Sequence, residues 1–401
     1  FSGADWLGEI PSDWKVCPLK YIFTIKQRIA GEPGHTVLSI TQSGIKPKDM
    51  SGQGQFAQDY SNYQLVYPGD FAMNHMDLLT GWVDLSKYEG VTSPDYRVFI
   101  NNDDTTYLSE YYKYIFQYCY SGRVFYGLGQ GVSGFGRWRL PAEMFLNFRL
   151  PVPPKSTQET IVQYLNRKVA HIDSVIAEAK ASIEEYKAWK ASVIYEAVTK
   201  GLDPDVEMKD SGVDIIGSMP AHWNTCRLKY LCDVMTGNQD TQNADDNGEY
   251  PFYVRSPIVQ RANVYTYEGE GILMAGDGAG AGRVFHHAFG KYAIHQRVYC
   301  FHNFRNINTA YFLYLISELF KKVMDKGSAQ STVPSVRLPM IQNFVFCIPS
   351  EDEQRQIVAY LNERCSKIDA LISEKDALIA DLESYKKSLI FEVVTGKRKV
   401  V

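Results

Sequence analysis

Two glycine-rich loops that end in arginine are the most chemically suggestive features of this 401-residue chain. One runs from Gly127 to Arg139 and the other from Ala275 to Arg283. Glycine lets backbone N–H groups approach a phosphate or a base edge closely, and an arginine fork can bind guanine or phosphate through two hydrogen bonds. The alternative for either loop is a tight β-turn with a solvated arginine. The residue types therefore favour recognition of a phosphate or a base.

A third polar loop, 327–332, precedes Arg337-Leu338-Pro339, as Gly129-Gln130-Gly131 precedes Arg139-Leu140-Pro141. Each loop comes shortly before the strand expected to lead out of a globular unit. This matched placement strengthens the prediction that both loops read a ligand.

Catalytic patterns are missing from the chain. It contains no G-x-x-x-x-G-K-[ST] phosphate loop, and the Gly276–Gly280 segment lacks the βαβ context of a dinucleotide site. Asn74-His75-Met76-Asp77 is not the Asn-Pro-Pro-Tyr/Phe motif of amino-methyltransferases. The histidines at 286, 287, 295 and 302 have no partners at zinc-ligand spacing. We expect no catalytic residue, no metal and no cofactor in this chain.

The elements that position these loops occur twice. The segment from Gln158 to Thr199 recurs 196 positions later, from Gln354 to Thr395, and residues 2–21 recur as 211–230 at a shift of 209. A long internal repeat indicates two copies of one structural unit. Because the shift shrinks along the chain, the two copies share a frame and differ in their loops.

Each repeat ends in a long amphipathic helix. From Ile161 to Ala197, and from Ile357 to Val393, apolar residues recur at steps of three and four, close to the 3.5-residue period of paired helices. Gly201 and Gly396 are expected to stop the helices. Two amphipathic helices packed separately on their own domains are the alternative. We favour antiparallel pairing, which would place the globular units at opposite ends of a rod.

The fold class predicted is α+β, with two mostly-β domains related by pseudo-two-fold symmetry and separated by an antiparallel coiled coil of two long helices. We expect domains at 1–152 and 201–348, and helices at 153–200 and 349–401. Within the domains, short β-like runs at 37–40, 65–67 and 96–100 alternate with turns, and helices are expected at 108–120 and 310–324.

Composition limits the function classes. The net charge is −4, which is not the basic profile of a nucleic-acid binder, so a DNA-binding surface requires segregated charge or a partner. No apolar run approaches the roughly 20 residues of a membrane helix, and no signal peptide is evident. Phe1 suggests a natural N-terminus further upstream. The 7 scattered cysteines indicate packed, reduced thiols and a cytoplasmic protein.

The duplicated motifs resemble the DNA-specificity subunit of type I restriction–modification systems, over essentially the whole chain. They are Trp6-Leu7-Gly8-Glu9-Ile10-Pro11 before Trp14 with its twin Met219-Pro220-Ala221-His222-Trp223, Ser93-Pro94-Asp95-Tyr96, His295-Gln296-Arg297-Val298-Tyr299, and the Gln-x-x-Ile-Val-x-Tyr-Leu-Asn helix starts.

The resemblance implies two target recognition domains that read an asymmetric bipartite double-stranded DNA sequence, with the helices setting the gap between half-sites. It implies a non-catalytic subunit that assembles with two modification (methyltransferase) subunits and with restriction subunits. S-adenosylmethionine, ATP and Mg are expected on those partners, not on this chain.

Combining the loops with the resemblance, we predict DNA-contacting residues in both units. They are Asn74, His75, Gln130, Ser133, Arg137 and Arg139 in the first unit, and Arg283, Ser328, Gln330 and Arg337 in the second. The outward faces of the two helices are expected to dock the methylating partner. The alternatives are a tandem-domain coiled-coil scaffold that binds proteins without DNA, and a nucleotide-using enzyme built on the 276–282 loop.

Overall fold

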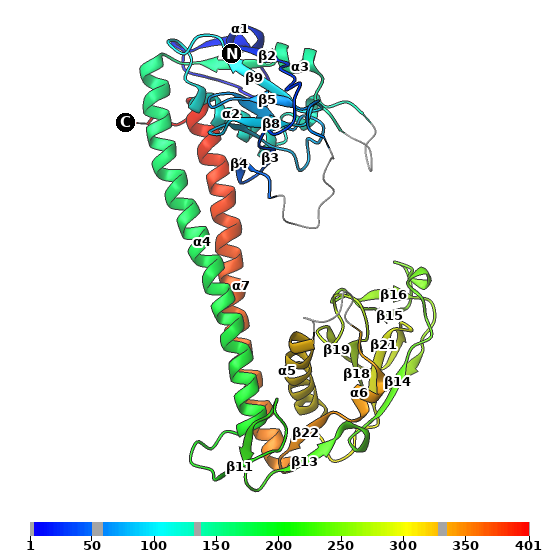
Figure 1. Ribbon diagram of the computed structural model, residues 1–401. Helices are drawn as coiled ribbons and strands as arrows, with labels where there is room; N and C mark the ends of the chain where they lie inside the picture. Colours follow the sequence, from blue (N-terminus) through cyan, green and yellow to red (C-terminus); the bar gives the residue numbers. More distant parts are fainter. Residues whose placement is uncertain (1–3, 50–58, 132–137, 328–334, 401) are drawn as a thin grey trace. The chain divides into compact units, whose positions relative to one another are not determined.

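The structure, a computed structural model, describes residues 4–49, 59–131, 138–327 and 335–400 (Figure 1). It divides into two compact units. Unit 1 comprises Phe1–Lys180 and Asp376–Val401, and unit 2 comprises Ala181–Lys375. Each unit therefore contains one globular part and a stretch of both long helices.

The long helices are α4 (Lys155–Lys200) and α7 (Glu351–Val394), and they lie side by side (Figure 1). In unit 1, Lys386 Nζ lies 2.6 Å from Asp173 Oδ1, and Lys180 Nζ lies 3.8 Å from Glu383 Oε1. Residue numbers rise along α4 as they fall along α7, so the helices run antiparallel, as predicted.

Most of the apolar positions of the 3.5-residue pattern on α4 and α7 are buried, and Ala197, Ile357 and Leu361 belong to the core of the globular part of unit 2. The buried positions that were predicted from this pattern are Ile161, Leu165, Ile172, Ile176, Ala179, Ile183 and Ala197 on α4, and Ile357, Leu361, Cys365, Ile368, Ile379, Leu389 and Val393 on α7. Two lysines that interrupt this apolar pattern, Lys190 and Lys386, form ion pairs with aspartates of the facing helix. In unit 2, Lys190 Nζ lies 2.7 Å from Asp369 Oδ2.

Glycine follows the end of each long helix. Gly201 has φ +77° and Gly396 has φ +73°, a left-handed conformation that residues with a Cβ adopt only with strain. The predicted helix stops are thus confirmed.

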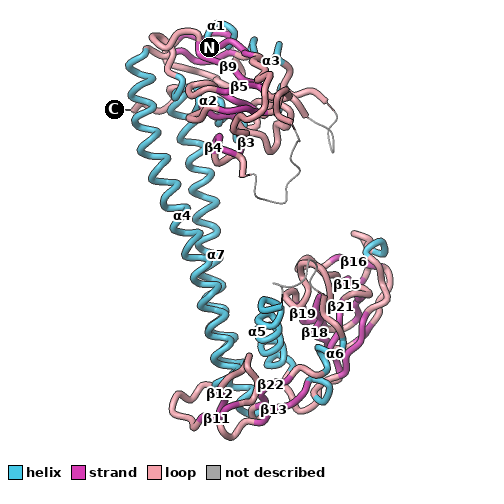
Figure 2. The backbone as a smooth tube through the Cα atoms, in the orientation of Figure 1, coloured by secondary structure: helices cyan, strands magenta, loops and turns pink. Residues whose placement is uncertain are grey.

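The globular part of unit 1 is built mainly from strands and loops (Figure 2). Its elements are β1 (Lys15–Pro18), α1 (Leu19–Ile22), β2 (Phe23–Lys26), β3 (Leu38–Thr41), β4 (Gly44–Pro47), β5 (Gln64–Val66), β6 (Phe71–Met73), β7 (Val83–Leu85), β8 (Gly90–Thr92), β9 (Arg97–Asn101), α2 (Ser109–Ser121), η1 (Tyr126–Leu128), α3 (Ala142–Asn147) and β10 (Arg149–Val152).

Unit 2 repeats this arrangement with additional strands. Its elements are β11 (Met208–Asp210), β12 (Ser218–Pro220), β13 (Asn224–Arg227), η2 (Leu228–Tyr230), β14 (Asp233–Thr236), η3 (Thr241–Asn243), β15 (Tyr250–Tyr253), β16 (Gln260–Ala262), β17 (Tyr267–Glu268), β18 (Gly271–Ala275), β19 (Phe285–Ala288), β20 (Lys291–Ile294), β21 (Val298–His302), α5 (Thr309–Gly327), α6 (Leu338–Gln342) and β22 (Val345–Ile348).

The main sheets of the two units share one strand order. Unit 1 has β2-β9-β6-β7 and unit 2 has β14-β21-β18-β19, and in each unit a separate antiparallel pair, β1-β10 or β13-β22, joins the entry strand to the exit strand. The α+β class and the shared frame are confirmed. The strands and helices predicted within the units lie within a few residues of β3, β5, β9, α2 and α5.

Aromatic side chains fill the core of each unit, because one helix covers the main sheet. In unit 1 the ring of Phe116 on α2 packs against Phe23 and Phe99 of the sheet. In unit 2 Phe312 on α5 contacts Phe301 and Phe346. Five of the seven cysteines are buried, in agreement with packed thiols.

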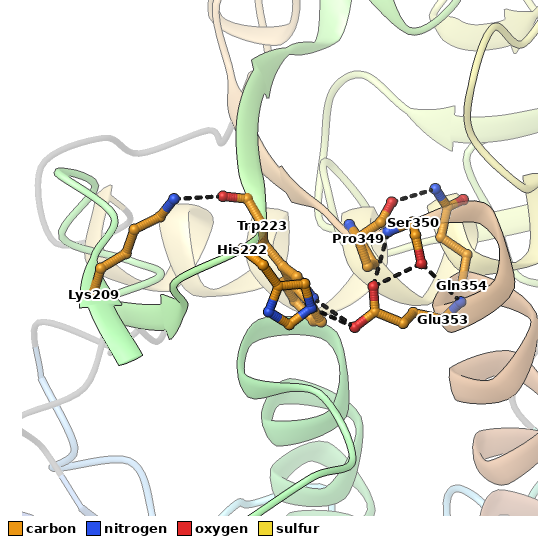
Figure 3. Close-up of polar contacts among 7 residues, drawn as sticks. All are labelled: Lys209, His222, Trp223, Pro349, Ser350, Glu353 and Gln354. Atoms are coloured by element: carbon orange, nitrogen blue, oxygen red, sulfur yellow. Dashed lines mark hydrogen bonds and ion pairs between the residues drawn. The ribbon is translucent and has the colours of Figure 1, made fainter. Parts of the chain in front are cut away.

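The first turn of α7 is anchored to the rest of unit 2 (Figure 3). Ser350 and Glu353 form a capping box: Glu353 N donates to Ser350 Oγ at 3.3 Å, and Ser350 N donates to Glu353 Oε2 at 3.1 Å. The other carboxylate oxygen accepts from Trp223 Nε1 at 3.1 Å and lies 2.7 Å from His222 Nε2. One carboxylate thus caps the helix and ties it to the segment before β13.

Candidate nucleic-acid interface

In unit 1 the fold brings together four residues that were predicted to contact DNA. Asn74 and His75 directly follow strand β6, and Leu140 N donates to His75 O at 2.9 Å. Gln130 and Arg139 exchange two backbone hydrogen bonds, of 2.8 and 3.1 Å. The side chains of Gln130 and Arg139 are exposed, whereas those of Asn74 and His75 are half-buried.

The two half-buried residues, Asn74 and His75, also interact with other groups of the protein. The Asn74 side-chain oxygen accepts from Met76 N at 3.2 Å, and the Asn74 carbonyl accepts from the Tyr120 hydroxyl at 2.7 Å. Burial, together with the nearby charges of Arg97 and Arg139, lowers the pKa of His75 to about 4, so its imidazole is neutral at ordinary pH. A neutral imidazole can donate through one ring nitrogen and accept through the other.

A buried arginine supports this corner of unit 1. Arg97 donates through its guanidinium to Leu140 O at 3.0 Å, and the guanidinium carbon lies 4.7 Å from the centre of the Phe145 ring. Burial lowers the pKa of Arg97 to about 10, which still leaves it charged. This contact holds the strand segment that presents Arg139.

Four of the predicted contact residues lie outside the described residues: Ser133, Arg137, Ser328 and Gln330.

Unit 2 uses the same backbone pairing at the equivalent place. Val336 N donates to Gly276 O at 2.8 Å, and the backbones of Asp277 and Ser335 form an isolated antiparallel β-bridge. The glycine-rich turn after β18 therefore adjoins the segment that leads to Arg337, whose side chain is exposed at the start of α6. Arg283, by contrast, is engaged within the protein, since its guanidinium lies 2.7 Å from Asp325 Oδ1 on α5.

The structural register differs from the alignment of Arg139-Leu140-Pro141 with Arg337-Leu338-Pro339. The buried residues Leu140 and Val336 make the equivalent hydrogen bonds, and eight positions later Phe148 and Phe344 accept from Leu19 and Leu228. Arg139 thus corresponds to Ser335. The register is set by the buried residue, Leu140 or Val336, because this residue packs in the core and forms the backbone hydrogen bond. The shared Arg-Leu-Pro sequence does not set it. A short helix, α3 or α6, also separates each loop from its exit strand.

A cluster of three charged residues at the unit 2 corner was not among the predicted contact residues. Arg255 Nη1 lies 3.0 Å from Asp277 Oδ1, and Arg297 Nη1 lies 2.5 Å from Asp277 Oδ2. Burial would raise the pKa of Asp277, but hydrogen bonds from Arg297 and Arg255 hold it below its ordinary value. Arg297 stands within the His295-Gln296-Arg297-Val298-Tyr299 motif of the sequence, whereas Arg255 carries no local signal.

The histidines at 286, 287 and 295 are turned to separate protein groups: Ser256 O, Glu270 and the Arg297 N–H. Within the described ranges, no three His, Cys, Asp or Glu side chains gather closely enough to hold a metal ion. The described helices also include none with the length and apolar character needed to cross a bilayer.

Comparison with known proteins adds a family match. The family described as "Type I restriction modification DNA specificity domain" matches residues 11–185 and 220–380. The specificity subunit of the type I restriction enzyme EcoDI from Escherichia coli is 25% identical over 181 residues, which cover 45% of this chain and 40% of that protein. The MjaVIII specificity subunit from Methanocaldococcus jannaschii is 23% identical, over 67% of this chain and 66% of that protein.

These two alignments thus span less than two thirds of each relative. A solved structure, reported under the words "Structural basis underlying complex assembly and conformational transition of the type I R-M system", shares the fold. It superposes with a TM-score of 0.73 at 15% identity, covering 97% of this chain and all of that one.

Proposed function

The chain belongs to the family of type I restriction modification DNA specificity domains, and on that premise we propose that it is the DNA sequence-recognition subunit of a type I restriction–modification complex. It reads an asymmetric bipartite target in double-stranded DNA, with one half-site for each globular part. The observation that best supports this proposal is that the two units share one strand order but present different polar side chains at equivalent positions.

The equivalent corners support different half-sites. In unit 1 the exposed side chains are Gln130 and Arg139, beside Asn74 and His75. In unit 2 the exposed predicted side chain is Arg337, at the start of α6 and beside the glycine-rich turn after β18. Arginine and glutamine suit bidentate readout of base edges, each pair contributing about 1–3 kcal/mol of discrimination. Two different sets of readers predict two different half-sites.

We assign the domains as 1–152 and 201–348 for target recognition, and 153–200 and 349–401 for the spacer helices. Ser133, Arg137, Ser328 and Gln330 remain predicted contacts on the same loops. Arg283 would have to release Asp325 to reach DNA, which makes it the least favoured of the predicted residues.

The chain has no catalytic role of its own. Two modification subunits bind S-adenosylmethionine and methylate the DNA, and restriction subunits use ATP and Mg. Their positive surfaces complete a DNA-binding channel that this chain, with a net charge of −4, does not build alone. We place the complex in the cytoplasm, where its DNA is.

The outward faces of α4 and α7 are the proposed docking surface for the modification subunits. Trp189 on α4 and Tyr385 on α7 are each 48% exposed and occupy equivalent positions in the repeat, 196 residues apart. Large exposed aromatic residues are typical anchors of protein interfaces. Their duplication suits a partner that is present in two copies.

The test is to sequence the methylome of cells that carry the modification subunits with and without this chain. We expect a bipartite adenine-methylation motif only when the chain is present. Arg139→Gln should relax or abolish recognition of one half-site and leave the other intact, and Arg337→Gln should affect only the other. Methylation that is unchanged by removal of the chain would overturn the proposal.

A protein scaffold without DNA binding is the second candidate function. It is favoured by Tyr21 and Tyr230, which are strongly exposed at equivalent positions beside Lys20 and Lys229. A complex that assembles fully, yet binds every duplex equally weakly at physiological salt, would favour this function.

A further inference from the structure

We propose that Arg255 and Arg297, oriented by Asp277, form a clamp for one backbone phosphate of the DNA at the half-site read by unit 2. This inference rests on the proposed function, because it names the ligand group that this corner of unit 2 binds. No motif in the sequence places the three residues together, since they come from three separate segments: the one after β15, the turn after β18 and the one before β21.

The three charges are arranged with the negative group inside and the positive groups outside. The Asp277 side chain is only 15% exposed, whereas those of Arg255 and Arg297 are 44% and 62% exposed. Each arginine uses one terminal nitrogen on the carboxylate, which leaves other N–H groups for a ligand. The cluster carries a net charge of +1, so its exposed side attracts an anion.

The surroundings also suit a phosphate. Arg255 and Asp277 line a cavity of about 330 Å³ together with Thr241, Ser256 and the glycine-bearing turn 278–280. Hydroxyl groups can donate to phosphate oxygens, and glycine allows close approach of the backbone. The adjacent carboxylate of Asp240 is already engaged by Gln242 N and by the Gln296 side chain.

The ion pairs are not needed to hold the three segments together. Gly276 N donates to Arg297 O at 2.9 Å, and His295 N donates to Tyr253 O at 3.0 Å, so the backbone already joins these segments. Ion pairs with largely exposed arginines add little to stability. A purely structural role therefore leaves two exposed guanidinium groups unexplained, whereas phosphate binding accounts for both.

The corresponding corner of unit 1 is built differently. Arg97 takes the place of Tyr299, not of Arg297, because it pairs with Met73 as Tyr299 pairs with Met274 and donates to Leu140 O as the Tyr299 hydroxyl donates to Val336 O. Arg97 is also buried over the Phe145 ring. The proposed contact is thus specific to one half-site, which makes it separable from DNA binding in general.

The experiment uses the full complex with its modification subunits and compares the wild type with Arg255→Gln/Arg297→Gln. The probe is the target duplex, titrated over a salt series. We expect the dissociation constant to rise about tenfold or more, because two charge-assisted hydrogen-bonding groups are lost. The slope of log K against log salt should fall by about 0.9, as for one phosphate contact. The methylated sequence should stay the same.

Arg305→Gln is the matched control, because Arg305 is an exposed, ion-paired arginine that lies beyond the opposite end of β21 in the same unit. Asp277→Asn separates orientation from charge. The change removes one negative charge but also releases the two arginines from their fixed orientation. An oriented clamp therefore predicts weaker DNA binding by this variant, whereas attraction by net charge alone predicts tighter binding. Tighter binding by Asp277→Asn would overturn the proposal.

A duplex series that carries one neutral methylphosphonate at each position of the second half-site locates the phosphate. When the methylphosphonate replaces the phosphate that the clamp binds, the affinity of the wild-type complex for DNA should fall to that of the double variant. At every other position the wild type should still bind more tightly. An unchanged salt slope, an equal loss in Arg305→Gln, or altered base preference, which would indicate guanine readout, would reject the clamp. If the wild-type complex shows no target-specific binding, the proposed function itself has failed.

Discussion

The buried hydroxyl of Tyr111 on α2 donates a 2.7 Å hydrogen bond to the carbonyl oxygen of Val394, the last residue of α7. Unit 2 contains the counterpart: the Tyr311 hydroxyl donates to Val198 O, near the end of α4, at 3.1 Å. The last carbonyls of a helix have no partner within the helix. In each unit, therefore, the helix that covers the sheet also caps the C-terminal end of a long helix.

Removing this hydroxyl should destabilise one unit at a time. Tyr111→Phe leaves the buried Val394 carbonyl without its donor, so we expect the free energy of unfolding of unit 1 to fall by about 1–3 kcal/mol. Hydrogen exchange of the full chain should show faster exchange in peptides of unit 1 only. Tyr311→Phe should speed exchange in peptides of unit 2 only. Tyr88→Phe, at an exposed tyrosine of unit 1, is the control and should change neither unit.

The lysine–aspartate pairs between α4 and α7 should contribute to their antiparallel pairing. Lys190→Glu places a second negative charge beside Asp369, and adding Asp369→Lys restores an opposite pair. Because both side chains are partly exposed, we expect a coupling energy of about 0.5–1 kcal/mol that shrinks in high salt. A double-mutant cycle by urea unfolding at two salt concentrations measures it. Zero coupling at low salt would contradict the prediction.

The carboxylate of Glu353 makes the anchoring of α7 dependent on pH. Burial would raise its pKa, but hydrogen bonds from His222, Ser350 and Trp223 lower it from 4.5 to about 2. Since the folded-state pKa lies below the unfolded one, the stabilisation is complete above pH 4.5 and is lost as the pH falls toward 2.

We expect Glu353→Gln to reduce the free energy of unfolding of unit 2 at pH 6, and to matter progressively less as the pH approaches 2. Chemical unfolding of both proteins over this pH range gives the difference. Glu351→Gln is the control, since Glu351 is exposed in the same helical turn and its ion pair is with Arg355. A Glu353→Gln difference that stays constant with pH would show that the ionised carboxylate is not responsible.

The exposed aromatic residues of the long helices should anchor the modification subunits. Trp189→Ala and Tyr385→Ala should each weaken binding of one copy by about 2 kcal/mol, the scale of an interface hot spot. Native mass spectrometry of the reconstituted complex should then show a one-to-one species at concentrations where the wild type binds two copies. Trp189→Phe should restore most of the binding. Full two-copy assembly by the double alanine variant would exclude this surface.

The elements of this protein could be predicted closely from the sequence, because the signals that encode them are local. The period of the apolar residues from Ile161 to Ala197 specifies a helix, and Gly201 marks its end. Duplication of these signals in one chain is visible without coordinates, and it predicted two units on one frame. The positions of Gln130 and Arg139 on glycine-rich loops were likewise recognisable from residue type and spacing.

The contact of Arg255 and Arg297 with Asp277, by contrast, could not be predicted from local sequence patterns. It depends on the register of three backbone segments that lie far apart in the chain, and registers are set by which side chains are buried. The same reason explains why Val336, and not Leu338, occupies the position in unit 2 that Leu140 occupies in unit 1. Local patterns carry the identity of helices, strands and loops, whereas side-chain partnerships between distant segments follow from packing and exist only in the folded chain.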